Sequence, residues 1–314
     1  MYCKKYSLVF FVFCLLQISF SQKTIEKEIA IAAHPDSLYG TLSIASKDYL
    51  CIIHAGSGPT DRNGNSEIGI ECNYLKKIAD SLAKNGISVF RFDKRGIGKS
   101  KDALEYEDSS TIQTYKSDLN TWINYFSNKP YKFKRIILIG HSEGALISTL
   151  VAQNNKKVKK LILISGPGFR LDTIIKRQLA YLHENAKKII FPLIDTIASG
   201  KKVENIPPML NMLFRESVQN YLISTLSIDP AVELEKIKIP TLIVQGTNDI
   251  QVSVDNAYRL KEHCKNCELK IIENMNHVLV DAPKDRKSNI ETYSNPDLTL
   301  SKDLIHTIIK FIKK

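Results

Sequence analysis

One serine of this sequence has neighbours suited to nucleophilic chemistry. Ser142 lies in the segment 140–144, Gly-His-Ser-Glu-Gly, which follows the aliphatic run 136–139 and precedes a helix-like run, 145–152. A sharp turn between a strand and a helix strains the serine backbone and lifts its hydroxyl into the open. Glycines on both sides of the serine leave room for such a turn. The pattern therefore predicts Ser142 as a nucleophile.

A serine hydroxyl needs a histidine to take its proton and a carboxylate to hold that histidine in the right tautomer. Asp249 follows the strand-like run 241–244, and His277 follows the run 269–272. Because the carboxyl ends of parallel strands lie at one edge of a sheet, we expect these side chains to meet Ser142 there. Asp249 and His277 are therefore the predicted acid and base.

Other acids and histidines fit these roles less well. Asp255 lies inside an expected helix, and Asp281 follows His277, which reverses the expected chain order of serine, acid and histidine. His141 is fixed beside the serine. Four further histidines do not follow a strand directly: His34, His183, His263 and His306.

Acyl transfer also requires N–H donors for the oxyanion that develops on the substrate carbonyl. The glycine-rich segment 54–59 follows the strand-like run 50–53, so its backbone can point an N–H at the substrate. We expect the backbone N–H of Ser57 to serve, with Gly56 as the alternative, together with the N–H of Glu143 directly after the nucleophile.

The elements that position these residues alternate between strand-like and helix-like segments, which is typical of an α/β fold with a mostly parallel central sheet and helices on both faces. The alternation stops over about 171–235, where we expect a helical lid rich in Ile, Leu and Met, and a polar exposed loop is expected over 281–298. The expected strands lie at 50–54, 89–92, 135–139, 161–164, 241–244 and 269–272.

The N-terminus resembles a secretory signal. Lys4 and Lys5 precede the apolar run 8–20, which ends in the small-residue pattern Ser19-Phe20-Ser21. The apolar run is shorter than the ~20 residues that span a bilayer, so we expect no stable membrane anchor after cleavage. The prediction is a signal peptide over 1–21, one α/β domain over 22–314, and a secreted or periplasmic protein.

The distribution of charge and the spacing of the cysteines argue against some classes of partner and of site. The formal net charge is +11, but the lysines are spread over many segments without an aromatic-basic stripe, which argues against nucleic acid. Four cysteines follow the expected signal peptide, and their pairing stays open: Cys51, Cys72, Cys264 and Cys267. The spacing of the last two suits a local disulfide or two plain thiols better than a metal or redox site, which would need further ligands.

Together these residues resemble the α/β-hydrolase superfamily. The segment 56–65 resembles a loop of bacterial EstD-type esterases, the segment 92–100 resembles the superfamily's turn before the nucleophile strand, and 240–252 resembles its acid-bearing strand and loop. Such relatives are grouped with serine aminopeptidase-like hydrolases of the S33 type. The resemblance implies hydrolysis of carboxylic esters first, and cleavage of peptides or thioesters second. One departure is Ala55, where many hydrolases have glycine after the strand histidine.

The predicted reaction is ester hydrolysis through an acyl-enzyme on Ser142, with no metal or organic cofactor. We expect a small-molecule ester with an apolar acyl group, held under lid residues that either cover the acyl pocket or only pack onto the core: Ile206, Met209, Leu210, Met212, Leu213 and Phe214. Asp61 and Arg62 are expected to pair and brace the loop 56–65, unless Arg62 meets an anionic substrate group.

Two other functions stay open. An aminopeptidase would need a lid carboxylate at the pocket to hold the substrate amine, and the lid offers Glu184, Asp195, Glu204 and Glu216. A catalytically silent binding protein would keep the fold and the lid around an apolar ligand. The apparent triad argues against this last reading.

Overall fold

The computed structural model describes residues 25–314. The expected signal peptide, residues 1–21, lies outside the described residues. Within the described part, none of the helices combines the length and the apolar character needed to cross a membrane.

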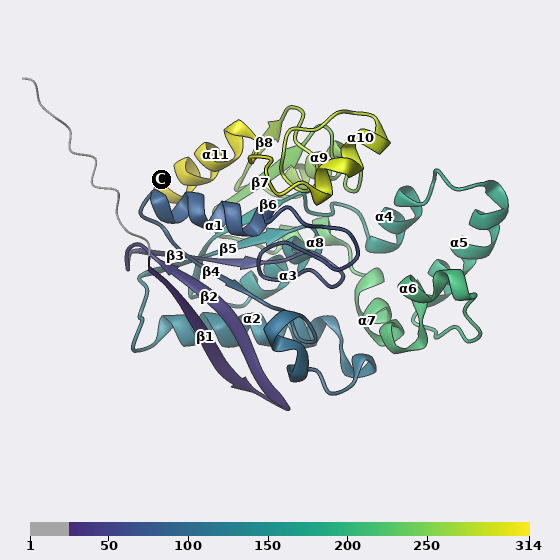
Figure 1. The fold of residues 1–314 in the computed structure, drawn as a ribbon, viewed down its shortest axis with the longest axis horizontal. Helices are drawn as coiled ribbons and strands as arrows, with labels where there is room; N and C mark the ends of the chain where they lie inside the picture. The colour runs from purple at the N-terminus through teal and green to yellow at the C-terminus, as the bar shows by residue number, and fades with distance from the viewer. Residues whose placement is uncertain (1–24) are drawn as a thin grey trace, which may run out of the picture.

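Eight strands form one sheet in the order β1-β2-β4-β3-β5-β6-β7-β8 (Figure 1). Strands β1 and β2 pair antiparallel, β2 pairs antiparallel with β4, and every later pairing is parallel. The mostly parallel α/β sheet expected from the sequence is therefore confirmed. The strands are β1 (Ile25–Ala33), β2 (Asp36–Ile44), β3 (Tyr49–His54), β4 (Ser88–Phe92), β5 (Arg135–His141), β6 (Val158–Ile164), β7 (Thr241–Gly246) and β8 (Cys267–Ile272).

Helices cover both faces of the sheet and bury an apolar core under each. Parallel strands buried on both faces read as continuous aliphatic runs, which is why β5 and β6 are recognisable in the sequence. One core lies under α1 (Tyr74–Lys84) and α11 (Lys302–Lys313). The other lies under α2 (Ile112–Ser127), α3 (Glu143–Ala152), α8 (Pro230–Glu235) and α9 (Val254–Glu262).

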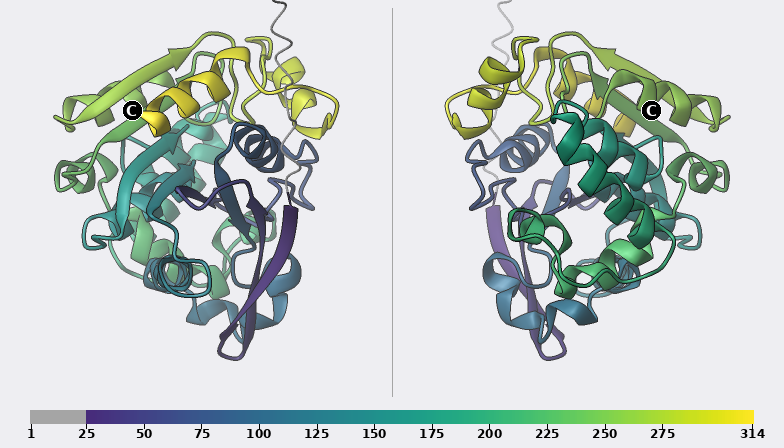
Figure 2. Two further views of the ribbon diagram at one scale, coloured as in Figure 1. Left: turned by 90° about the vertical axis from the view of Figure 1, so that its left-hand side faces the viewer. Right: turned by 90° about the vertical axis from the view of Figure 1, so that its right-hand side faces the viewer.

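The segment between β6 and β7 is helical and projects from the sheet at one end of the molecule (Figures 1 and 2). Besides α8 it holds α4 (Leu171–Gln178), α5 (Glu184–Ala198), α6 (Asn211–Phe214) and α7 (Glu216–Leu226). Helices α4 to α7, called the lid below, have a small core of their own: Ile190, Ile194, Ile197, Leu210, Phe214 and Leu226. The lid is thus a packed unit, not a single strap.

Two parts of the chain differ from the sequence prediction. The hairpin β1–β2 was not predicted, because most of its first strand is exposed at the sheet edge and only Ile29 is buried in it. The expected exposed loop over 281–298 is partly wrong. It contains α10 (Arg286–Glu291), and both Asn289 and Tyr293 are buried.

Asn289 is buried because it ties neighbouring loops together. Its side-chain amide donates to the carbonyls of Asn248, 2.9 Å away, and Pro283, 2.8 Å away. A polar side chain can be buried at little cost when its donors are satisfied in this way. The polar composition of the segment therefore reflects internal hydrogen bonds as well as solvent contact.

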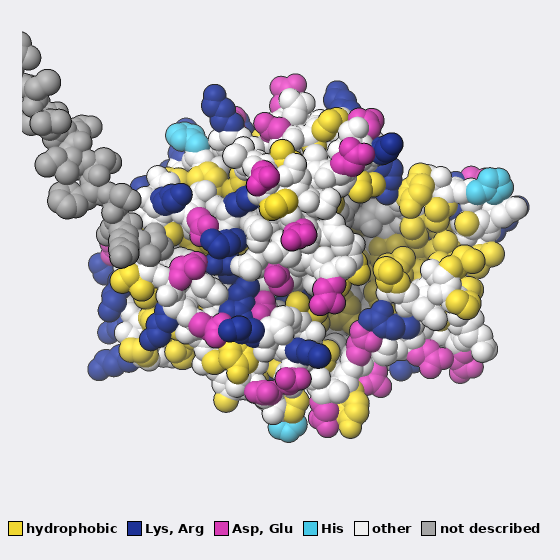
Figure 3. All heavy atoms as spheres, viewed as in Figure 1, with side chains coloured by type: hydrophobic (Ala, Val, Ile, Leu, Met, Phe, Trp, Pro, Cys, Tyr) yellow, Lys and Arg dark blue, Asp and Glu magenta, His cyan; other side chains and the backbone are white. Residues whose placement is uncertain are grey.

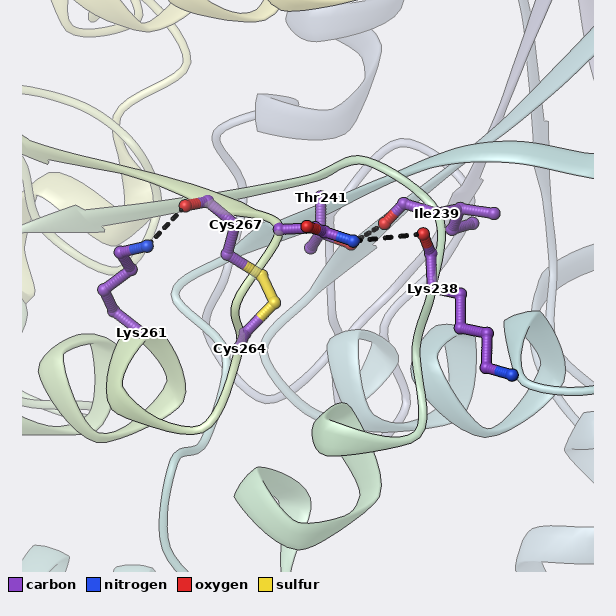
Figure 4. The surroundings of a disulfide bond; sticks show 7 residues. Lys238, Ile239, Thr241, Lys261, Cys264 and Cys267 are labelled. Carbon is purple, nitrogen blue, oxygen red and sulfur yellow. Dashed lines mark hydrogen bonds between the residues drawn. A yellow bond between two sulfur atoms is a disulfide. The ribbon is translucent and has the colours of Figure 1, made fainter.

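The cysteine pairing that the sequence left open is local. Cys264 and Cys267 form a disulfide between the end of α9 and the start of β8, with Cα atoms 5.4 Å apart (Figure 4). Cys51 and Cys72 are buried free thiols. The disulfide lies at the start of β8, whereas His277 follows the end of that strand, so it does not contribute to the candidate active site.

Candidate active site

Ser142 occupies a strained turn between β5 and α3. Its backbone has φ 52° and ψ −127°, outside the regions that non-glycine residues normally adopt. The turn is held because the Ser142 N–H donates to the Ile164 carbonyl of β6 at 2.9 Å, and the Ser142 carbonyl accepts from Ala145 N–H at 2.9 Å. Backbone strain of this kind persists where the surroundings over-determine it, which is common at active sites.

The two glycines beside Ser142 are required by close backbone packing. A Cβ at Gly140 would collide with the backbone of Gly144 and Ala145, and a Cβ at Gly144 would collide with the carbonyls of His54 and Ala55. These contacts explain the sequence pattern around the serine. They also bring the segment after β3 against the start of α3.

His277 and Asp249 are joined by a buried hydrogen bond. Nδ1 of His277 and Oδ2 of Asp249 are 2.8 Å apart. The same carboxylate accepts from the Gln245 side chain at 3.0 Å, and from the N–H groups of Gln251 and Val252, both at 2.9 Å. With Nδ1–H donating to the carboxylate, Nε2 of His277 is left as a proton acceptor.

The hydrogen bonds keep Asp249 ionised despite its burial. Burial by itself would raise the pKa of Asp249, but the nearby His277 and the hydrogen bonds to its oxygens outweigh burial and lower that pKa below its ordinary value. A charged carboxylate can stabilise the imidazolium that forms when the histidine takes up a proton.

His141 links the histidine loop to the serine turn. Its Nε2 lies 2.8 Å from the His277 carbonyl, its Nδ1 lies 3.2 Å from the Tyr74 hydroxyl, and the two histidine rings are 4.8 Å apart between centroids. Burial, with the charge of His277 as a second cause, lowers the pKa of His141 to about 3, so its ring is neutral. Because His141 directly precedes Ser142, these contacts bring His277 next to the turn.

Among residues 25–314, the hydroxyl of Ser142 and Nε2 of His277 are not hydrogen-bonded to each other. Hydrogen bonds between a catalytic serine and its base are often long without substrate, and they tighten in the reacting complex. The rival acids are engaged elsewhere. Asp255 pairs with Arg177 at 2.6 Å on the surface, and Asp281 accepts from the Ser301 hydroxyl.

Three candidate oxyanion donors lie around the serine turn. The Glu143 N–H is at the first residue of α3. A Cβ at Gly56 would lie 3.0 Å from the Ser142 Cβ, so this alternative donor is against the nucleophile, while Ser57 is exposed. None of these three N–H groups donates to another backbone or side-chain atom within the described chain. The choice between Gly56 and Ser57 therefore stays open.

Arg62 braces the loop after β3, but its partner differs from the one expected. Asp61 does not pair with Arg62; it accepts from the N–H groups of Asn63 and Asn65, both at 2.8 Å. Arg62 instead pairs with Asp93, 2.6 Å away, and its own N–H donates to the same carboxylate at 2.8 Å. The reason is geometric: Asp61 is used to form the turn, whereas Asp93 lies at the end of the adjacent strand β4.

Replacing Arg62 with Met is expected to lower the free energy of unfolding by about 3 kcal/mol, because it leaves the Asp93 carboxylate buried without its cation. The side chains are 8% and 3% exposed. Urea unfolding would measure the loss. The surface pair Lys134–Asp48, 75% and 57% exposed, gives a control, since Lys134→Met should leave the urea midpoint close to the wild-type value. Equal losses in the two variants would contradict this role.

Sequence reasoning missed a buried charge next to the candidate site. Lys94 lies in the turn after β4 and is 5% exposed, and the side chain of Glu143, for which no role was predicted, is also buried. Lys94 donates to the carbonyls of Gly56 and Gly58. The only signal in the sequence was a lysine two residues after a strand that ends at the expected site edge.

The apolar residues expected over the pocket divide into two groups. Leu210 and Phe214 pack inside the lid core. Met209 and Met212 are 86% and 69% exposed. Figure 3 shows other hydrophobic side chains around a hollow between the lid and the body of the molecule.

No group of three or more His, Cys, Asp or Glu side chains arranged to hold a metal ion occurs in the part of the chain that the structure describes. The groups that the geometry brings together around Ser142 are the side chains of His277 and Asp249 and backbone N–H groups. This arrangement can carry out nucleophilic acyl transfer.

Comparison with known proteins identifies the family of the chain and proteins that share its fold. Residues 68–283, more than half of the chain, match the family described as serine aminopeptidase, S33. A Monkeypox virus protein described as a monoglyceride lipase homolog is 26% identical over 68% of this chain and 80% of its own. An Escherichia coli hydrolase of 2-hydroxy-6-oxononadienedioate and 2-hydroxy-6-oxononatrienedioate is 28% identical over 65% of this chain and 75% of its own.

Solved structures share the fold. The esterase Est1E from Butyrivibrio proteoclasticus, solved with ferulic acid bound, superposes with a TM-score of 0.62 over 91% of this chain and 100% of its own, at 20% identity. The Pyrococcus furiosus esterase Pf2001 gives a TM-score of 0.61 over 93% and 91% of the two chains, also at 20% identity. At this identity the likeness establishes the α/β-hydrolase fold.

Proposed function

The chain belongs to the serine aminopeptidase S33 family of α/β hydrolases, with esterase and lipase relatives, and on that premise we propose that it is a carboxylic ester hydrolase. Ser142 is the proposed nucleophile, His277 the base and Asp249 the acid. The observation that carries this proposal is the buried His277–Asp249 hydrogen bond, tied through His141 to the strained turn that holds Ser142.

The proposed reaction has two halves. His277 Nε2 takes the proton of the Ser142 hydroxyl as its oxygen attacks the ester carbonyl, and the protonated histidine then gives that proton to the departing alcohol. Water, activated by the same histidine, next attacks the acyl-enzyme, releases the carboxylic acid and restores the serine hydroxyl. Asp249 keeps Nδ1 protonated throughout.

Backbone N–H groups stabilise the charge that develops on the carbonyl oxygen. We assign this role to the Glu143 N–H together with Ser57 or Gly56 from the loop after β3. Losing one such donor typically costs about 2.7 to 4 kcal/mol of barrier. The N–H of Glu143 is suited to it because the first N–H groups of a helix have no partner within the helix.

The acyl group is proposed to be apolar. The support is the hydrophobic hollow between the lid and the body in Figure 3, since pockets for such groups are concave and mostly apolar. The lid is accordingly proposed to cover the bound acyl chain.

Cleavage of peptides from a free amino terminus has less support. Asp195 is 61% exposed and pairs with Lys176, and Glu184 is 73% exposed and pairs with Lys187. Glu143 is a buried acidic side chain beside the serine, but it faces the charge of Lys94. A substrate ammonium would therefore find no free carboxylate at these positions.

A series of p-nitrophenyl esters from acetate to palmitate tests this function and its acyl preference. We expect kcat/KM to rise from acetate to a medium-chain ester, because each buried CH₂ contributes about 0.8 kcal/mol until the pocket is filled. An aminoacyl-arylamide assayed at the same enzyme concentration should not turn over. Turnover of the arylamide without ester hydrolysis would reject the esterase in favour of the peptidase.

A further inference from the structure

Lys94 holds the loop after β3 by two carbonyl groups. Its ammonium, in the turn after β4, donates to the Gly56 carbonyl and to the Gly58 carbonyl, the latter at 2.8 Å. The side chain is 5% exposed. Burying an ammonium is expensive unless its protons are bound, so these two contacts give the loop a strongly preferred position.

Those contacts also orient the candidate oxyanion donors. The Gly56 carbonyl and the Ser57 N–H belong to one planar trans peptide and therefore point in opposite directions. Fixing the carbonyl toward Lys94 thus turns the Ser57 N–H away from it. The neighbouring peptide is held in the same manner, because Nδ1 of His54 lies 2.9 Å from the Ala55 carbonyl, which leaves the Gly56 N–H directed away from His54.

The charge of Lys94 interacts with the side chain of Glu143, whose backbone N–H is the other candidate oxyanion donor. Burial lowers the pKa of Lys94 to about 8, while the Glu143 carboxylate acts to raise it. Burial likewise raises the pKa of Glu143, and the charge of Lys94 and a hydrogen bond from Tyr221 of the lid oppose that change. Because Glu143 also supplies the second candidate N–H, the interaction between these two buried side chains connects both sets of candidate donors.

We propose that Lys94 is a positioning residue of the oxyanion hole, holding the 56–58 loop so that its backbone N–H points at the substrate oxygen, with the Glu143 side chain as its counter-charge. This inference rests on the proposed esterase function. A purely structural lysine would support the folded state without affecting transition-state binding at Ser142, and the two roles predict different kinetics.

The first test compares Lys94→Met with the control Lys101→Met, an exposed lysine in the turn that follows. For p-nitrophenyl butyrate we expect Lys94→Met to lower kcat about 10- to 100-fold with little change in KM, and the control to match the wild type. The affinity for an alkyl trifluoromethyl ketone, whose adduct with Ser142 carries an oxyanion, should fall by a similar factor. Circular dichroism and thermal unfolding establish that equal amounts of folded protein are compared.

The second test leaves Lys94 in place and so does not depend on the stability of its variants. Glu143 from α3 and His54 from β3 are the titratable groups facing Lys94. Burial lowers the pKa of His54 to about 3, so His54 does not titrate near neutral pH. Wild-type kcat should fall as pH rises through about 8, and Glu143→Gln, which keeps its N–H but removes the carboxylate, should move that fall to lower pH. In Lys94→Arg the fall should be absent, because a guanidinium stays protonated.

Each outcome decides the inference. The inference would be overturned if folded Lys94→Met kept the wild-type kcat and the wild-type affinity for the ketone. It would also be overturned if kcat fell at the same alkaline pH in Glu143→Gln as in the wild type. If Lys94→Met does not fold, the Glu143→Gln profile decides alone. A wild-type protein without Ser142-dependent ester hydrolysis would instead refute the proposed function, and this inference with it.

Discussion

Ser142→Ala is expected to lower kcat/KM for p-nitrophenyl butyrate by a factor on the order of 10⁴ or more, because no other group can form the acyl-enzyme. The remaining activity should come from substrate binding and the oxyanion donors alone. Folding should be preserved, since the hydrogen bonds at this position use only the backbone N–H and carbonyl. Initial rates under matched enzyme concentrations would measure the change.

Ser148→Ala provides the matched control for this prediction. Ser148 lies on the same helix, α3, and its buried hydroxyl has no hydrogen-bond partner among the described residues. Removing that hydroxyl leaves no partner unsatisfied, so kcat/KM and the thermal midpoint should stay at wild-type values. Equal activity in Ser142→Ala and Ser148→Ala would remove Ser142 from the mechanism.

Asp249→Asn is expected to lower kcat by about 10⁴-fold without unfolding the protein. An asparagine oxygen can still accept from the N–H groups of Gln251 and Val252, so the turn should be retained. The asparagine NH₂ group, however, donates a hydrogen bond where the carboxylate oxygen accepted one. His277 then accepts at Nδ1 and carries its proton on Nε2, so it cannot take the serine proton. Steady-state kinetics beside thermal unfolding would separate lost chemistry from lost structure.

Asp255→Asn is the control for Asp249→Asn, because the sequence alone left Asp255 as an alternative acid of the triad. Asp255 forms a surface pair with Arg177, and both side chains are nearly half exposed. The variant should keep the wild-type kcat. A large loss in Asp255→Asn with an unchanged Asp249→Asn would show that the acid had been assigned to the wrong residue after β7.

Local sequence patterns predicted the parts of the structure that depend on neighbouring residues. Consecutive aliphatics predicted β5, β6 and β7, and the predicted nucleophile, acid and base follow the strands β5, β7 and β8. The Asp249–His277 hydrogen bond could be anticipated because both residues follow strands that end at one edge. In each case the evidence lies within about ten residues of sequence.

Features set by distant contacts could not be predicted in this way. Arg62 pairs with Asp93 across 31 positions, and the adjacent Asp61 was the more obvious partner in sequence. Lys94 gives no sign of being buried, because its burial depends on carbonyls of another loop. The apolar residues of the lid cannot be told apart from the sequence, yet Phe214 packs inside the lid and Met209 is exposed. Only the three-dimensional packing separates these cases.

The measurement that tests the central claim most directly is labelling of the folded protein by a fluorophosphonate, followed by mass spectrometry of its peptides. A strained serine activated by His277 should displace the fluoride and become phosphonylated at Ser142, and labelling should disappear in both Ser142→Ala and heat-unfolded protein. Folded protein that stays unlabelled, or that is labelled at another residue, would contradict the claim that Ser142 is the nucleophile of this hydrolase.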